Sequence, residues 1–163
     1  MKIVDDFLAR RRAQKLRVAR SLPPAELAHL IDELVAAGPG AMPALSECLS
    51  HGEARAPALE ALDRLLTDAT FERFLDLLCS PNPTVVSGAA RVLSASRRFD
   101  ARRLLKALAE PKPAKSVLEP ILREHVAAIP IGEMVAMLPG LSREGQAVLL
   151  RLLDRVEDPH VSA

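Results

Sequence analysis

The chain has 163 residues, of which 49% are hydrophobic, so it is long enough and apolar enough to bury the core of one ordinary domain. Its charges nearly cancel, with 22 Lys and Arg against 21 Asp and Glu, and no bulk field indicates a nucleic-acid or membrane partner. The chain has four Phe but no Tyr or Trp. This scarcity of aromatic residues argues against carbohydrate clefts, base-stacking platforms and an all-β fold.

The cysteines and the N-terminus predict the compartment. Two cysteines, Cys48 and Cys79, are too few for a disulfide scaffold in a chain of this size, which favours a reducing cytosol. Asp5 and Asp6 stand where a signal peptide needs a basic and then an apolar run. No stretch approaches the ~18 uninterrupted apolar residues of a transmembrane helix. We therefore expect a soluble, cytoplasmic protein without a membrane partner.

Apolar residues recur at helical spacing along almost the whole chain, as in Phe71, Phe74, Leu75 and Leu78. The 13 prolines and seven glycines fall mainly between these segments, where they end one helix and open the next. No run reads as a strand. The pattern predicts an all-α fold with helices, in chain order, at residues 4–20, 24–37, 41–50, 54–67, 71–79, 84–96, 100–109, 114–128, 131–138 and 142–156.

Leucines also repeat on a longer scale of about 30 residues. One set stands near the ends of alternate predicted helices, at Leu49, Leu78, Leu108 and Leu138. A second set lies in the helices that follow, at Leu62, Leu93, Leu122 and Leu153. A period of about 30 with two helices per unit is typical of an α-solenoid, so we predict about five antiparallel helix pairs with the first set buried in equivalent positions. A non-repetitive helical bundle is the alternative.

One predicted unit resembles a known repeat family. It runs from Phe74-Leu75-Asp76-Leu77-Leu78 through Ser80-Pro81-Asn82-Pro83 and Val85-Val86 to Ala89-Ala90-Arg91-Val92-Leu93. This is similar to a HEAT repeat, whose first helix is Leu-rich, whose turn carries Asp and Pro, and whose second helix opens with Val-Arg. Ser80 and Val86 stand where the family usually has Asp and Arg, and Arg55 restores that Arg in the preceding unit. The resemblance implies one HEAT-like repeat domain over residues 1–163, and no particular function.

No constellation of residues indicates catalysis. Cys48 and His51 have the spacing of metal ligands, but no second pair follows. The chain has no phosphate-cradling glycine loop and no nucleophile motif. Its carboxylates stand mostly beside cations, as Glu60 does beside Arg64 at i, i+4, which is typical of a solvated helix face. We therefore expect no enzyme, no catalytic residue, no metal and no cofactor.

Basic clusters are the feature that favours nucleic acid. Residues 1–20 carry seven cations and two acids, and a second cluster lies at residues 97–106. Some members of the HEAT family act on alkylated DNA, and phosphate binding needs only Lys and Arg. The candidates for such binding are Arg10, Arg11, Arg12, Lys15, Arg17, Arg97, Arg98, Arg102, Arg103 and Lys106.

The favoured interpretation is a non-catalytic module for protein interaction or scaffolding. In a HEAT-like array the second helix of each pair lines a concave face. Exposed side chains on that face are predicted to include Glu60, Arg91, Glu119 and Arg151. Because their charges alternate in sign, a protein partner suits them better than a phosphate backbone does. A helix or peptide lying across the array is the natural ligand.

The last predicted pair carries more apolar residues than one neighbouring pair can cover. They are Met134, Val135, Met137, Leu138, Val148, Leu149, Leu150, Leu152 and Leu153. We therefore expect an exposed apolar patch at this end, covered by self-association or by further repeats of a longer array of which this chain is the N-terminal part. A natural terminus with a frayed tail is the alternative.

Overall fold

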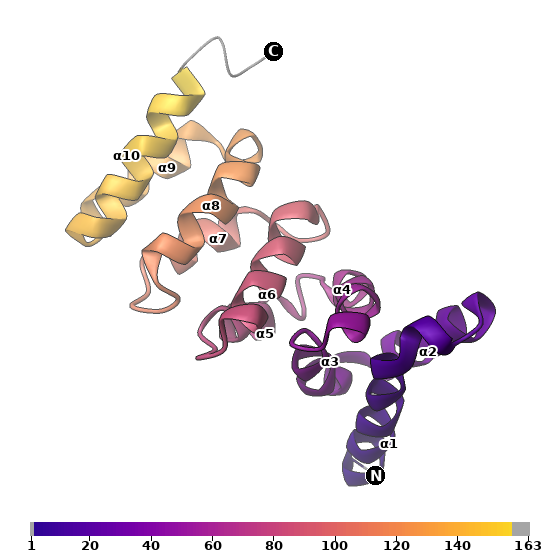
Figure 1. The fold of residues 1–163 in the computed structure, drawn as a ribbon. Helices are drawn as coiled ribbons and strands as arrows, with labels where there is room; N and C mark the ends of the chain where they lie inside the picture. The colour runs from indigo at the N-terminus through magenta and orange to yellow at the C-terminus, as the bar shows by residue number, and fades with distance from the viewer. Residues whose placement is uncertain (1, 158–163) are drawn as a thin grey trace. The chain divides into compact units, whose positions relative to one another are not determined.

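The computed structural model describes residues 2–157 (Figure 1). Over this range the chain forms ten α-helices, four short 3₁₀ segments and no strand, which confirms the prediction of an all-α fold. No helix in the described range is both long enough and apolar enough to cross a membrane. The elements, in order, are α1 (Lys2–Lys15), η1 (Leu16–Ser21), α2 (Pro24–Ala36), η2 (Gly38–Ala41), α3 (Met42–Cys48), α4 (Gly52–Leu65), α5 (Phe71–Leu78), α6 (Pro83–Ala95), α7 (Arg102–Ala107), α8 (Lys115–His125), η3 (Val126–Ala128), α9 (Ile131–Met137), η4 (Leu138–Gly140) and α10 (Arg143–Glu157).

The ten predicted helices occur in the predicted order, and the differences lie at their ends. The helix expected at 4–20 ends as α1 at Lys15 and continues as the 3₁₀ segment η1, inside which Val18 has φ −115° and ψ 29°, outside the helical range, and kinks the chain. The helix expected at 114–128 changes to the 3₁₀ segment η3 after His125. Pro24 and Pro83 are the first residues of α2 and α6, positions at which the missing N–H of proline costs nothing.

The chain divides into two compact units, Met1–Val92 and Leu93–Ala163, and each is described by itself. In unit 1, α4 lies at the centre and packs against α2, α3 and η1. The largest fully buried side chains of this unit are Phe71, Phe74, Leu16, Leu34, Leu45, Leu49, Leu62 and Leu66. They come from five elements, η1, α2, α3, α4 and α5, and from the turns that follow α3 and α4, so the unit has one shared core.

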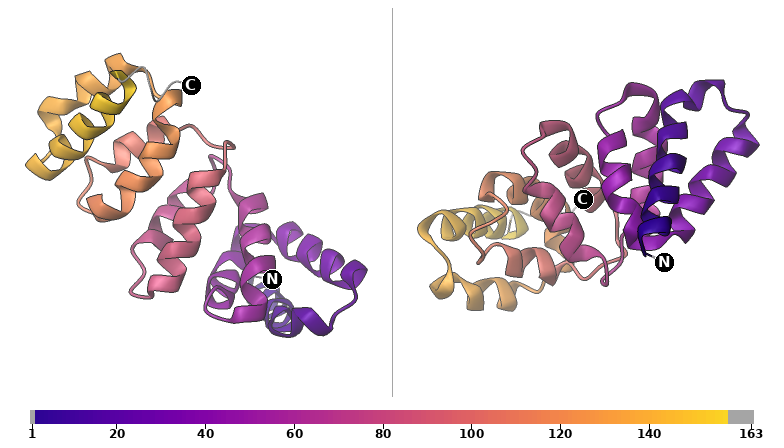
Figure 2. Two further views of the ribbon diagram at one scale, coloured as in Figure 1. Left: turned by 45° about the horizontal axis from the view of Figure 1, so that its top comes forward. Right: turned by 90° about the horizontal axis from the view of Figure 1, so that it is seen from below.

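In unit 2, α10 packs against α8 and α9, and α7 packs against α8 (Figures 1 and 2). The repeating leucines are buried in the first three positions of each set, at Leu49, Leu78, Leu108, Leu62, Leu93 and Leu122. Leu138 and Leu153, the fourth members, are only half-buried. The burial predicted for the first set is therefore confirmed at three of its four positions. Leu138 is the C-cap of α9, as Leu49 is of α3 and Leu108 is of α7, but it also opens the 3₁₀ segment η4.

Polar contacts between helices recur at nearly one sequence separation within each unit. In unit 1, Arg64 Nη1 lies 2.7 Å from Asp32 Oδ1, and these residues are 32 apart in sequence. In unit 2, Arg151 and Glu119 are also 32 apart, and Arg102 and Glu133 are 31 apart. Such contacts place α4 beside α2, α10 beside α8, and α9 beside α7. The separation matches the leucine period.

Candidate interaction surfaces

The four residues predicted for a concave face have different surroundings. Glu60 on α4 and Arg91 on α6 have exposed side chains. Glu119 on α8 accepts two hydrogen bonds from Arg151 on α10, Nε to Oε1 and Nη2 to Oε2, each 2.8 Å long. These bonds hold the pKa of the Glu119 carboxyl below its usual range. The structure therefore brings Glu119 and Arg151 together as an ion pair that links α8 to α10.

The first basic cluster keeps most of its cations on the surface of unit 1. Arg10, Arg11, Lys15 and Arg17 are exposed. Arg12 is half-buried, and its Nη2 lies 3.5 Å from Glu33 Oε1 on α2. Among the described residues no acidic side chain lies within ion-pair distance of Arg10, Arg11 or Lys15. These cations are available to an anionic partner.

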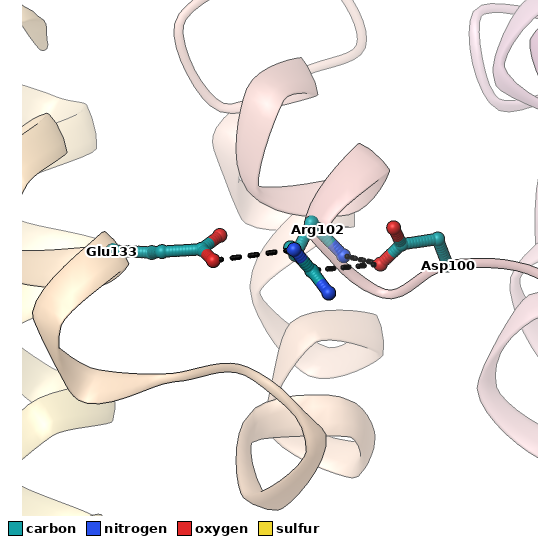
Figure 3. A network of polar contacts seen from close by, with 3 residues as sticks. All are labelled: Asp100, Arg102 and Glu133. Atoms are coloured by element: carbon teal, nitrogen blue, oxygen red, sulfur yellow. Dashed lines mark hydrogen bonds and ion pairs between the residues drawn. The ribbon is translucent and has the colours of Figure 1, made fainter.

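The second basic cluster, in unit 2, is partly engaged within the chain. Arg97 donates to the carbonyl oxygens of Ser94 (2.8 Å), Ser96 (3.1 Å) and Glu124 (3.2 Å). Arg102 lies between two carboxylates, with Nε 3.4 Å from Asp100 and Nη1 3.3 Å from Glu133 (Figure 3).

The other members of this cluster differ in exposure. Arg98 and Lys106 are exposed, and Arg103 is half-buried. Because of the contacts given above, Arg97 and Arg102 help to hold the elements of unit 2 together.

The most exposed large apolar side chains lie on α1, where the sequence analysis placed only charge. Ile3 is 84% exposed, Val4 60%, Phe7 62% and Leu8 37%. Ala9, Ala13 and Leu16 are the buried residues of this segment. The alanines at i and i+4 were the missed signal, because a pair of small residues at helical spacing marks a docked side that the larger residues do not share.

The predicted apolar patch at α9 and α10 is smaller than expected. Met134, Val148, Leu149 and Leu152 are buried, because α9 and α10 pack on each other and α8 covers α10. Met137, Leu138 and Leu153 are half-buried. Only Val135 and Leu150 of the nine are exposed, at 50% and 51%, and the neighbouring Ile131 is 48% exposed.

The side chains that could bind a metal ion or act as a nucleophile take part in packing. Among the described residues no three His, Cys, Asp or Glu side chains stand close enough to hold a metal ion. Burial raises the pKa of the Cys48 thiol, whose Sγ donates to Ala13 O at 3.3 Å, so this thiol stays protonated at neutral pH.

A groove of about 440 Å³ between α1 and α2 is lined by Asp5, Asp6, Leu8, Ala9, Arg12, Glu33, Ala36, Ala37 and Gly40.

The buried histidine of unit 2 also has a structural partner. His125 is 2% exposed, its Nε2 lies 2.7 Å from Leu93 O, and its ring centroid lies 5.1 Å from that of Phe99. Burial lowers the pKa of this imidazole. A neutral ring with its N–H on a carbonyl is therefore part of the packing of α8 against residues 93–99.

No family model matches this chain, and neither does any curated protein or solved structure.

Proposed function

We propose that this chain is a HEAT-like helical-repeat module of the cytoplasm that binds another protein and carries out no catalysis. The recurring contacts support the repeat. Asp32–Arg64 and Glu119–Arg151 each join the second helices of neighbouring pairs, and both span 32 residues. Arg102–Glu133 joins two first helices, α7 and α9. Contacts of first helix to first and second to second, one period apart, are typical of stacked helix pairs.

The observation that carries the binding function is the exposed face of α1. Three of the four phenylalanines, Phe71, Phe74 and Phe99, are buried, whereas Phe7 is 62% exposed beside Ile3 and Val4. Adjacent exposed apolar side chains on a helix are typical of a surface that another molecule covers. Recognition by such a surface needs no reacting group, in keeping with a module that carries no catalysis.

The charged positions Glu60 and Arg91 extend the proposal to the second helices. Both side chains are exposed, so both are able to meet a partner that lies across α4 and α6. Glu119 and Arg151 contribute less in this proposal, because a partner has to compete with their mutual bidentate contact.

Affinity capture from the native host, followed by mass spectrometry, tests this function. The bait is the wild-type chain, Phe7→Ser, or the matched control Leu150→Ser, which changes an apolar residue on α10 that is 51% exposed. We expect a protein that wild type and the control recover with or without nuclease, and that Phe7→Ser loses. Identical recovery by all three baits contradicts a binding role for α1, and recovery that nuclease abolishes favours nucleic acid.

Nucleic-acid binding is the second candidate, and the exposed cations of α1 and η1 favour it. Arg10, Arg11, Lys15 and Arg17 are exposed, as phosphate contacts need to be. Against it, Arg97 and Arg102 of the second cluster are engaged with groups of their own unit. Duplex DNA binding that falls steeply with salt and is lost when Arg10, Arg11, Arg12 and Lys15 become Gln establishes this alternative.

A further inference from the structure

The exposed face of α1 has two halves that follow each other along the helix. In the first two turns, Ile3, Val4, Phe7 and Leu8 are exposed apolar side chains. In the next two turns, Arg10, Arg11 and Lys15 are exposed cations. At helical spacing Val4, Leu8, Arg11 and Lys15 form one row, since they stand at i, i+4, i+7 and i+11. We name these seven residues the α1 face.

The rest of unit 1 holds the helix without using this face. Ala9 and Ala13 are each 2% exposed, and α1 packs through them against α3 and η2. The acids of the helix do not join the row, because Asp5 and Asp6 fall at other helical positions and line the groove beside α2. The α1 face therefore combines apolar surface and positive charge, with no carboxylate among its seven residues.

We propose that the α1 face binds a helix of another protein that carries apolar residues over two turns and carboxylates over the next two. This inference rests on the proposed function and names the chemistry of its partner. A row of side chains at i, i+4 and i+7 spacing, such as the one that contains Val4 and Leu8, forms a ridge that packs into the groove of a second helix. Guanidinium and ammonium groups one to two turns further along then face the partner's Asp and Glu side chains. Positive charge opposite negative charge sets the direction of the partner along α1.

Other occupants fit this arrangement less well. A second α1 packed face to face in parallel brings Arg10, Arg11 and Lys15 against the same cations, and packed antiparallel it sets cations against apolar side chains. A helix lying on a membrane separates its apolar and cationic residues around its axis. The α1 face instead separates them along the axis. A nucleic acid offers phosphates for the cations but nothing that covers Ile3, Val4 and Phe7.

A synthetic peptide provides the test. It is a helix of about three heptads, with Leu at successive a and d positions in one half and Glu on the same face in the other. A single Trp on the peptide reports binding without background, because the protein has no Trp or Tyr. One control peptide has Lys in place of every Glu, and a second has the same composition in scrambled order.

We expect the acidic peptide to bind saturably and the two control peptides not to bind. The affinity for the acidic peptide should fall as salt is added. Phe7→Ser and Arg11→Gln should each weaken binding by at least about tenfold, the loss typical of an interface anchor. Leu150→Ser and Arg155→Gln, equivalent changes on α10, should leave it unchanged. Circular dichroism and the unfolding midpoint of each variant show that the fold is intact, which the exposure of Phe7 and Arg11 predicts.

Several results overturn the inference. They are failure of the acidic peptide to bind, equal binding of the Lys peptide, equal losses in the control variants, or Phe7-dependent binding to vesicles of phosphatidylcholine and phosphatidylserine or to duplex DNA in place of the peptide. If host capture depends on Phe7 and the acidic peptide does not bind, the inference fails and the proposed function stands. If host capture also shows no dependence on Phe7, the binding role of α1 fails as well.

Discussion

Two helices of unit 1, α5 and α1, use phenylalanine in opposite ways. Phe71 and Phe74 on α5 are both 0% exposed and stand at i, i+3, so they enter the core together. Phe7 on α1 is 62% exposed and shares its side of the helix with other apolar residues and with cations. The side by which α1 docks carries Ala9 and Ala13 instead. The same residue type thus stabilises the fold in one helix and remains available for binding in the other.

The side by which a helix docks decides whether its large apolar residues are buried or exposed. Helix α5 places its largest side chains on the docked side, where each removes a large area from water. Helix α1 approaches its neighbours through small side chains, so its larger residues remain outside. Hydrophobicity alone therefore does not identify core residues. The following predictions test this contrast between buried and exposed groups in order of expected effect.

The phenylalanines should differ most when each is truncated. Phe74→Ala should lower the free energy of unfolding by about 3–5 kcal/mol, because it removes a fully buried ring and leaves a cavity. Phe7→Ala should change it by less than about 0.5 kcal/mol, as is usual at exposed positions. Urea unfolding followed by circular dichroism measures both. Similar losses for the two variants would show that Phe7 belongs to the core.

Two glycines of unit 1 provide the next contrast. A Cβ at Gly88 would lie 2.8 Å from Leu49 Cδ1, and Leu49 is only 1% exposed, so the leucine has little room to move. Gly88→Ala should therefore destabilise the protein on balance, because overpacking of about 1–3 kcal/mol opposes the gain of about 1 kcal/mol that alanine brings inside a helix. At Gly52, also in a helix, a Cβ would meet nothing within 4 Å, and Gly52→Ala should stabilise by up to about 1 kcal/mol.

The same unfolding measurement serves for both variants. A neutral or stabilising Gly88→Ala would mean that α6 and the α3–α4 turn are less closely packed than the contact with Leu49 indicates.

The histidines should differ in the pH dependence of stability. Burial holds the pKa of His125 below 6.5, with Arg97 adding to this effect and the Leu93 carbonyl and Glu124 opposing it. As pH falls, the imidazole of His125 is therefore protonated in the unfolded chain before it is protonated in the folded one. The contribution of His125 to stability is full above pH 6.5 and is lost as pH falls towards the lower pKa of the folded state. His125→Gln should reduce this loss, measured by unfolding between about pH 7.5 and 5.5.

The control for that experiment is His29→Gln. This variant replaces a histidine whose side chain is 75% exposed, in contrast to the buried His125. If the two variants change the profile equally, burial of His125 is not the cause.

The smallest effect is expected at the exposed link between α8 and α10. Arg151→Gln removes both 2.8 Å hydrogen bonds to Glu119, but water replaces them on a side chain that is 56% exposed. The loss of stability should be smaller than for Gly88→Ala and should shrink further as salt rises. Glu119→Gln should behave alike, and a double-mutant cycle isolates their coupling. A large loss that is insensitive to salt would show that this pair acts through packing.

Several features of the candidate surfaces were predictable from the sequence, and others were not. The exposure of Glu60 and Arg91 follows from helical spacing, because both stand off the apolar side of their helices. The pairing of Glu119 with Arg151 does not, since their contact spans 32 residues and depends on how two helices lie side by side. The engagement of Arg102 with Glu133 was hidden for the same reason. Charge clusters in a sequence therefore overstate the charge that a partner meets.

The all-α class, the order of the ten helices in residues 2–157 and a leucine period close to the spacing of the contacts between helices all follow from the amino-acid pattern. These are local properties, because helical periodicity and proline or glycine breaks act over a few residues. The amino-acid pattern does not show that Phe7 lies outside while Phe74 lies inside, or that His125 contacts the Leu93 carbonyl. Those outcomes depend on which surface lies opposite each side chain. That surface comes from residues far away in the chain, whose approach no local pattern records.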